Sequence, residues 1–144
     1  MAFRKILIAV DSDPIALHAA EVGIGLAASL DAQIAFAHAV DPSVVYAPEA
    51  GLPANEADLA AQRDGKRLLD TIRMRLPDST RSFDFVLSGN APQAIVKAAK
   101  DWQADMIVIG SHGRRGVSRA VMGSVAEDVL RRAHCPVVVV PAPA

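Results

Sequence analysis

Short runs in which every residue is apolar constrain the fold of this chain more than any other feature. Residues 6–10 read Ile-Leu-Ile-Ala-Val, residues 106–109 read Met-Ile-Val-Ile, and residues 137–140 are four valines. A strand with one wet face alternates apolar and polar side chains, whereas a continuous run indicates burial on both faces, as in a parallel sheet. The chain therefore predicts a sheet whose central strands are covered by helices on both sides.

Segments with a helical spacing of apolar residues separate these runs, so that strands and helices alternate along the chain. Such alternation is typical of parallel βαβ units with right-handed crossovers. We expect one α/β domain over residues 1–144, built on an open, doubly wound, five-stranded parallel sheet of Rossmann-like type. The expected strands are 6–10, 33–39, 83–87, 105–109 and 136–140, the expected helices are 15–30, 55–76, 92–102 and 124–133, and a long loop spans 41–54.

The spacing also predicts which side chains face the core. The third strand begins with alternation, which indicates a sheet edge. Asn90 is expected to cap the helix that follows it. The residues expected to point inward are Ile15, Ala19, Val22 and Leu26 in the first helix, and Leu59, Leu68, Leu69, Ile72 and Leu76 in the second.

Composition bounds the function classes. The chain has 144 residues, a net charge of -1 and one cysteine. This charge gives no indication of a nucleic-acid partner or of an anionic membrane surface. No apolar run is long enough to cross a membrane, and one cysteine cannot form an internal disulfide. We therefore expect a soluble, cytoplasmic protein.

The stretch 110–124 is unsuited to core packing and lies between an expected strand and an expected helix. It contains four glycines, three arginines and three serines. Glycine allows the backbone to approach a phosphate closely, and N–H groups near Gly123, Ser124 and Val125 can donate to an anion. The stretch has neither Gly-Lys-[Ser/Thr] nor Gly-x-Gly-x-x-Gly, so it matches neither a P-loop nor a dinucleotide fingerprint. It predicts a phosphate-binding loop of another kind.

Asp11 follows the first expected strand, and the Gly-rich stretch follows the fourth. Ligands bind doubly wound sheets outside the carboxyl ends of the strands, where the strand order reverses. If the two strands are neighbours, Asp11 can accept a hydrogen bond from a ribose hydroxyl while the loop holds phosphates. Two interpretations stay open for Arg114, Arg115 and Arg119, which either contact phosphates or form solvated surface.

The pattern Gly110-x2-Gly113-x9-Gly123-Ser124 resembles the ATP-binding signature of the universal stress protein family. The resemblance extends over the whole chain, from the Lys-Ile-Leu-Ile-Ala-Val-Asp segment at 5–11 to the His-Cys-Pro-Val-Val-Val-Val segment at 134–140. It implies the strand order 3-2-1-4-5, binding of ATP or of AMP or ADP, and a homodimer formed through the last strand, 136–140.

The resemblance also implies roles for single residues. Val10 and Asp11 would approach the base and ribose, and Ala39 and Ile109 would line the adenine pocket. Ala39 is smaller than the valine often found there, which would loosen the adenine contact. The residues implied to hold ribose and phosphates are Gly110, Gly113, Gly123, Ser124 and Val125, with Arg114 as a candidate phosphate contact.

Three further features have simpler interpretations. An exposed edge made only of valines would aggregate, so we expect the last strand to pair with its own copy across a twofold axis. His38 is interpreted as a polar residue at a strand end. Cys135 is interpreted as buried and unreactive.

Three functions compete. The first is a nucleotide-dependent stress-response regulator that binds ATP, AMP or ADP, with Mg²⁺ as a candidate companion ion. The second is a slow ATPase or nucleotide transferase, for which the sequence offers no convincing base, because Glu127 and Asp128 lie on the last helix without a clear role. The third is a dimeric interaction protein that binds no nucleotide.

Overall fold

The computed structural model of the chain describes residues 2–11, 14–41, 53–77, 80–111 and 122–142. The expected loop at 41–54 lies almost wholly outside them. Helices and strands alternate along the described residues, as the apolar pattern predicts, with bounds that differ from the expected ones by a few residues. The elements are β1 (Lys5–Ala9), α1 (Pro14–Leu30), β2 (Gln33–Val40), α3 (Ala54–Arg73), β3 (Ser82–Ser88), α4 (Ala91–Trp102), β4 (Met106–Gly110), α5 (Ser124–Arg132) and β5 (Val137–Val140).

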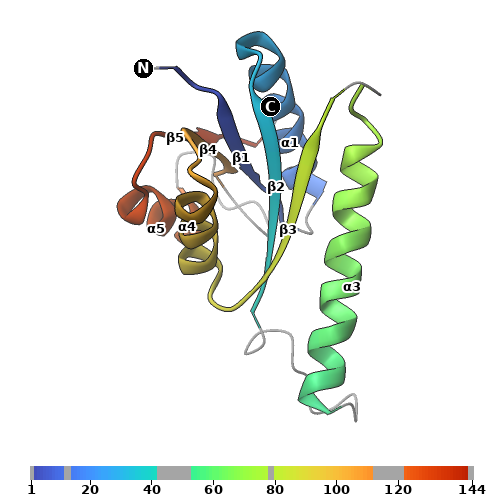
Figure 1. The fold of residues 1–144 in the computed structure, drawn as a ribbon. Coiled ribbons are helices and arrows are strands. Elements are labelled where there is room, and N and C mark those ends of the chain that lie inside the picture. The colour runs from blue at the N-terminus through green and yellow to red at the C-terminus, as the bar shows by residue number, and fades with distance from the viewer. Residues whose placement is uncertain (1, 12–13, 42–52, 78–79, 112–121, 143–144) are drawn as a thin grey trace.

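The strands form one parallel sheet in the order β3-β2-β1-β4-β5, seen nearly edge-on in Figure 1. The order 3-2-1-4-5 is therefore confirmed, and β3 is an edge strand as its alternation predicts. The chain moves from β1 outward through β2 to β3, then returns to the other side of β1 through β4. The strand order thus reverses between β1 and β4, and this is the place where such sheets bind ligands.

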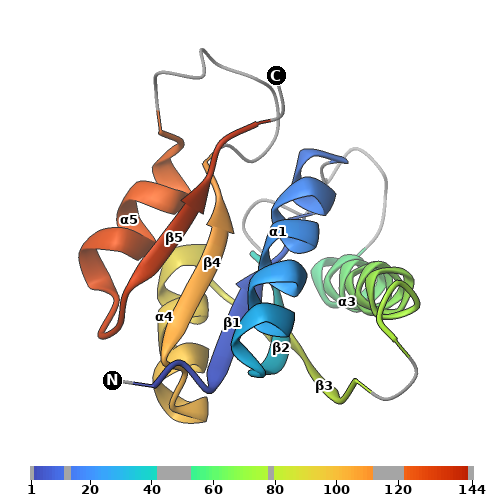
Figure 2. The same cartoon turned by 90° about the horizontal axis from the view of Figure 1, so that it is seen from above.

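Two layers of helices cover the sheet. Helices α1 and α3 lie on one face and α4 and α5 on the other, which is clearest from above (Figure 2). Successive side chains of a strand point to opposite faces. In β1, Ile6 and Ile8 therefore join the core under α1 and α3, while Leu7 and Ala9 join the core under α4 and α5. This double burial explains why the β1 run is continuously apolar.

Helix α1 packs against the sheet through small residues, and the expected inward position of Val22 is wrong. Val22 is 38% exposed, whereas Ala16, Ala19, Ala20 and Ala27 are buried. At Gly23 a Cβ atom would lie 2.8 Å from side-chain atoms of Ile8. At Gly23 the helix therefore approaches β1 so closely that a larger residue would collide with Ile8. The larger residues Leu17, Ile24 and Leu26 are only partly buried and pack against the same core.

Helix α3 buries only its second half. Leu69 and Ile72 are buried as expected, but Leu59 is 52% exposed, so its expected inward position is wrong. The helix ends at Arg73, and Leu76 is buried just beyond that end. In Figure 1 the first turns of α3 extend past the carboxyl end of β3, which leaves Leu59 no sheet to pack on.

Across the described ranges, no helix combines the length and apolarity needed to cross a membrane.

Candidate functional site

The carboxyl ends of β2, β1 and β4 meet at one edge of the sheet. The pairing register places Ala9 beside Ala37 and Ile8 beside Val108. Counting forward along the parallel strands, Asp11, Ala39 and Ser111 lie at the same level: Asp11 and Ser111 follow the ends of β1 and β4, while Ala39 is still within β2. Ala37 and Ile109 belong to the core under α4 and α5, and Ala39 continues that face of β2. The sheet thus brings Asp11, Ala39 and Ile109 to one edge, as predicted.

Val10 is held by its backbone at this edge. It is buried, its N–H donates to the Ala37 carbonyl at 2.8 Å, and its own carbonyl accepts from Nδ1 of His38 at 2.8 Å. Both polar groups of the Val10 main chain are therefore engaged on the β2 side. Asp11 follows with a half-buried side chain that has interactions of its own.

The two ends of the Gly-rich stretch are joined. Gly110 ends β4 and pairs with Val140, and the Ser111 N–H donates to the Val140 carbonyl at 2.8 Å. The Ser111 carbonyl accepts from the N–H of Gly123. The stretch therefore leaves and re-enters the fold at one point, beside the end of β4. Gly113 and Arg114, together with His112, Arg115 and Arg119, lie outside the described residues.

Helix α5 presents its amino end at that point. Gly123 occupies the cap position with extended backbone and supplies no side-chain cap, and the first bond within the helix runs from the Glu127 N–H to the Gly123 carbonyl. The N–H groups of Ser124 and Val125 precede this bond, so they have no acceptor within the helix. Both residues are exposed. An uncapped, accessible helix amino end favours an anion through its N–H groups and its dipole.

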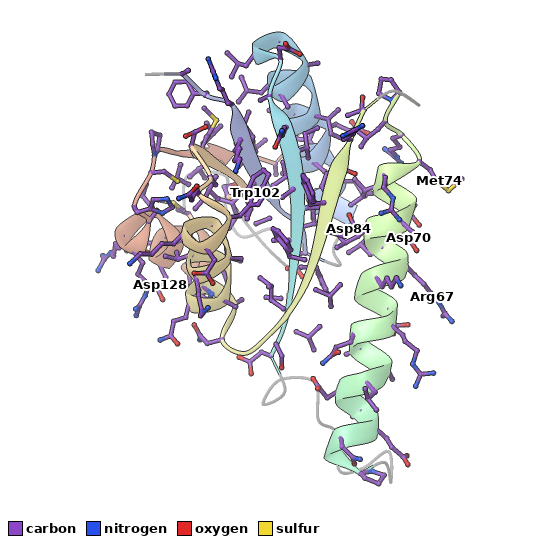
Figure 3. The ribbon with its side chains drawn as sticks, in the orientation of Figure 1. Arg67, Asp70, Met74, Asp84, Trp102 and Asp128 are labelled. Carbon is purple, nitrogen blue, oxygen red and sulfur yellow. The ribbon has the colours of Figure 1, made fainter. Side chains whose placement is uncertain are left out.

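The carboxylates of α5 are directed along the helix. Glu127 bonds Arg131 at 2.7 Å, and Asp128 bonds Arg132 at 3.0 Å. Each partner lies one turn toward the carboxyl end of the helix, so these carboxylates are engaged away from the amino end (Asp128 is labelled in Figure 3).

A second helix start borders the same edge. Gly89 adopts φ of 127°, which disfavours any other residue, and its N–H donates to the carbonyl of Val40 at 2.9 Å. Asn90 then caps α4 by accepting from the Gln93 N–H at 3.3 Å, which confirms the expected cap. The β3–α4 connection is thus tied to the carboxyl end of β2, beside Ala39.

His38 is a functional candidate that the sequence interpretation missed. It is not a strand-end residue but lies inside β2 and is only 9% exposed. Its ring reaches across to the Val10 carbonyl, one residue before Asp11. The alternation of side chains along β2 indicates that His38 is buried, because it lies on the same face as Ile34 and Phe36, under α3. A polar ring buried there needs a hydrogen-bond partner.

The titratable groups with shifted pKa in the described part of the chain lie away from this edge. Burial raises the pKa of Asp84 on β3, although Arg73 of α3 bonds it and opposes the shift, while Asp70 adds to it (Figure 3). Cys135 is only half-buried, so the expectation that it is buried is wrong. Burial, then Asp105, raises the pKa of its thiol, which favours the less reactive protonated form. Within the described ranges no group of His, Cys, Asp and Glu is arranged to hold a metal ion.

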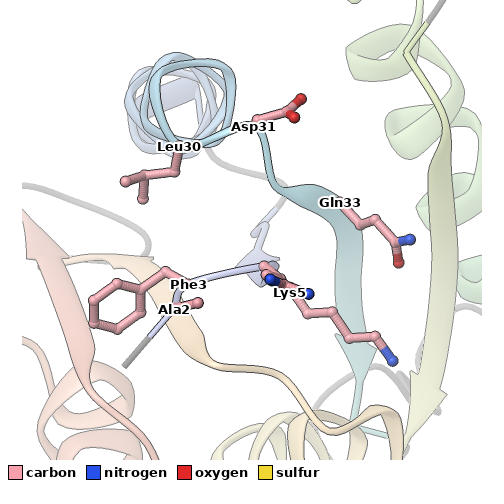
Figure 4. Close-up of a pocket in the computed structure, with 7 residues that line it drawn as sticks. Ala2, Phe3, Lys5, Leu30, Asp31 and Gln33 are labelled. Atoms are coloured by element: carbon pink, nitrogen blue, oxygen red, sulfur yellow. The ribbon is translucent and has the colours of Figure 1, made fainter.

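A cavity of about 700 Å³ lies at the opposite edge of the described part of the sheet. Phe3, Lys5 and Gln33 line it at the starts of β1 and β2, with Leu30 and Asp31 from the end of α1 (Figure 4). It opens at the amino ends of the strands, whereas doubly wound sheets bind ligands at the carboxyl ends. We therefore place the candidate site at the carboxyl edge.

Comparison with known proteins is consistent with this geometry. The model of the universal stress protein family matches residues 2–141. Universal stress protein MJ0531 of Methanocaldococcus jannaschii is 34% identical over 98% of this chain and 84% of its own length. The solved structure of MJ0577, from the same organism, superposes with a TM-score of 0.84 at 26% identity and covers 97% of this chain and 96% of that one.

Two solved structures contain adenine nucleotides. A universal stress protein in complex with cAMP has a TM-score of 0.63 at 24% identity and covers 97% of this chain and 98% of its own. A universal stress protein from Archaeoglobus fulgidus in complex with dAMP has a TM-score of 0.65 at 22% identity and covers 96% of this chain and 98% of its own. At these identities the likeness concerns the fold.

Proposed function

Because this chain belongs to the universal stress protein family, we propose that it binds an adenine nucleotide at the carboxyl edge of the sheet, between β1 and β4. The bound nucleotide is ATP, or AMP or ADP, and the protein acts as a nucleotide-dependent regulator of a stress response in the cytoplasm. Solved proteins of the same fold hold cAMP and dAMP, which supports an adenine nucleotide as the ligand class.

One observation carries the proposal. Asp11 leaves β1 beside the point where β4 continues into Ser111, and Ser111 is bonded to Gly123 at the uncapped start of α5. A ribose-binding carboxylate and a phosphate-binding helix end are therefore only one strand apart.

We assign the parts of the nucleotide accordingly. Adenine lies against Ala39 and Ile109, with the Val10 backbone beside it, and Asp11 accepts a hydrogen bond from the ribose. The phosphates lie on the start of α5 and on the Gly-rich stretch. Where Mg²⁺ accompanies ATP, the phosphates and the Ser124 hydroxyl would supply the oxygen ligands that this ion prefers. The residues that hold ribose and phosphates in this assignment are Gly110, Gly113, Gly123, Ser124 and Val125, with Arg114 as a phosphate contact.

The carboxylates of α5 favour binding over hydrolysis. Phosphoryl transfer to water needs a group that orients the attacking water. Glu127 and Asp128 are the acidic residues of α5, and both pair with arginines toward its other end. A conformational signal from bound nucleotide therefore suits the site better than turnover.

We also propose that two copies pair through β5. The strand ends the sheet on the side away from β4, and three of its four valines are only partly buried. An exposed apolar edge strand tends to associate with another strand, and the β5 of a second copy can pair with its free backbone N–H and carbonyl groups.

The nucleotide that copurifies with the protein tests the proposed ligand. Denaturing the purified protein should release an adenine nucleotide, and adding ATP or AMP to stripped protein should raise its melting temperature. When the free nucleotide concentration is 100 times Kd, binding at one site should raise the free energy of unfolding by about 2.7 kcal/mol. Absence of a released nucleotide, together with an unchanged melting temperature for ATP, ADP and AMP, would contradict the proposal. Phosphate release measured in the same samples separates binding from turnover.

A further inference from the structure

A buried imidazole lies directly behind the proposed site. His38 is 9% exposed, and its Nδ1 is 2.8 Å from the carbonyl oxygen of Val10. A carbonyl oxygen can only accept, so Nδ1 carries the proton and the ring is the donor. The tautomer of His38 is thereby assigned by its partner.

This bond holds the chain where the ladder between β1 and β2 ends. The last pair in the register is Ala9 with Ala37, and the Val10 N–H still donates to Ala37. The Val10 carbonyl, one step further, is held by the side chain of His38. That carbonyl shares a rigid peptide plane with the N–H of Asp11. The orientation of this plane therefore sets how the chain enters Asp11.

Helix α3 leaves room for the ring at a single glycine. A Cβ atom at Gly65 would lie 2.5 Å from Cδ2 of His38 and 3.2 Å from its Nε2, the first of which is closer than real Cβ contacts come. Gly65 is buried in the interior of a 20-residue helix, where glycine is unfavourable. The residue is helical, so its contribution is space for the imidazole rather than an unusual φ.

We propose that His38, seated in the space that Gly65 leaves on α3, is a positioning residue of the nucleotide site. Its Nδ1–H orients the Val10–Asp11 peptide and thus the position of Asp11 toward the ribose. The inference rests on the proposed function and extends it, because it makes nucleotide affinity depend on how α3 packs against β2.

Two substitutions of similar size separate the hydrogen bond from mere packing. His38→Asn keeps an N–H donor near the place of Nδ1, whereas His38→Leu removes the donor and leaves the Val10 carbonyl unpaired. By calorimetric titration with AMP and ATP, we expect the leucine variant to bind roughly tenfold more weakly, the order of effect for an unpaired buried acceptor. The asparagine variant should stay within about twofold of the wild type on the same reasoning.

A matched glycine pair tests the space on α3 without altering His38. Gly65→Ala forces the ring away from the Val10 carbonyl and should weaken nucleotide binding as His38→Leu does. Gly25→Ala is the control, because a Cβ there would meet nothing within 4 Å on α1. It should bind as the wild type does. Far-UV circular dichroism shows which variants are folded, and should His38→Leu fail to fold, Gly65→Ala against Gly25→Ala decides.

The outcomes distinguish this inference from the function on which it rests. A wild type that binds no adenine nucleotide overturns the proposed function, and the positioning role with it. If the wild type binds the nucleotide, and Gly65→Ala and His38→Leu bind it with the same affinity, only the positioning role is overturned. Equal weakening by His38→Asn and His38→Leu also overturns it, since the donor would then be irrelevant.

Discussion

Asp84 shows how a single side chain can oppose the stability of the fold to which it belongs. It lies on β3 under α3, one carboxylate oxygen bonds Arg73, and the other is buried without a hydrogen-bond partner among the described residues. Burial exceeds the effect of Arg73, so the folded pKa is raised above the ordinary 3.8. The folded state therefore holds this proton more tightly than the unfolded state does.

This raised pKa determines in which direction the free energy of unfolding changes with pH. Because the native state binds more protons, the Asp84 contribution is greatest below pH 3.8 and is lost as pH rises through the folded pKa. Asp84→Asn removes the ionisable carboxyl group, and with it the loss of stability that its ionisation causes as pH rises. Chemical unfolding between about pH 3 and about pH 6 should show the variant gaining stability relative to the wild type as pH rises. A difference that is constant with pH, or that shrinks, would show that burial does not dominate at Asp84.

Single residues also mark the limits of prediction from sequence. The strand pairing places Asp11, Ala39 and Ile109 at one edge of the sheet. The place of Asp11 follows from a strand end that the local pattern predicts, whereas Ala39 and Ile109 were implied only by the family resemblance, and their contacts with a nucleotide stay predictions. The interpretation of His38 as a strand-end residue is wrong because its burial depends on α3, a distant segment in which Gly65 leaves room for the ring. The local spacing of apolar residues does not predict a contact between segments that lie far apart in the chain.

At the scale of elements, α1 shows why helices were located correctly while their inward faces were partly wrong. Periodicity locates a helix but does not state how closely it approaches the sheet. Here the approach at Gly23 selects a stripe of alanines, and Val22 is displaced to the surface. In α3 the error at Leu59 has another cause, since the sheet does not extend beneath the first turns of the helix.

The two glycines of α1 make this argument testable. Gly25→Ala adds a methyl group in open space and should stabilise the protein by about 0.5–1 kcal/mol through helix propensity. Gly23→Ala places its Cβ against Ile8 and should destabilise by about 1–3 kcal/mol through overpacking. Urea unfolding of both variants measures the contrast. If Gly23→Ala were as stable as Gly25→Ala, α1 would not pack on β1 as described.

For the whole molecule, the alternation of strands and helices predicts a doubly wound sheet, but the strand order came from the family resemblance. The local apolar pattern indicates that β1 and β4 are buried, but it does not indicate that they are neighbours in the sheet. The order then determines where the proposed site lies, because it places the end of β1, and with it Asp11, beside the end of β4. The contribution of Gly113 and Arg114 stays a prediction, since both lie outside the described residues.

The proposed pairing of two copies is also a property of the whole molecule. The carbonyls of Pro136 and Val140 accept from Ile107 of β4 and from Ser111 just after it, so the backbone N–H and carbonyl of the alternate residue Val139 face outward. Val139→Pro removes an outward N–H and keeps the bonds to β4. We expect size-exclusion chromatography with light scattering to show a dimer for the wild type and a monomer for the variant. A variant that stays dimeric, or a wild type that is monomeric at high concentration, would contradict pairing through β5.

The most direct test of the central claim is calorimetric titration of AMP and ATP into stripped wild-type protein and into Asp11→Ala. We predict one site per chain in the wild type and affinity lower by roughly tenfold or more in the variant, as expected when a charged hydrogen bond is lost. Asp101→Ala, at the end of α4 and paired with Lys97 on the surface, is the control and should bind like the wild type. No heat of binding to the wild type, or equal affinity in Asp11→Ala, would contradict an adenine nucleotide site between β1 and β4.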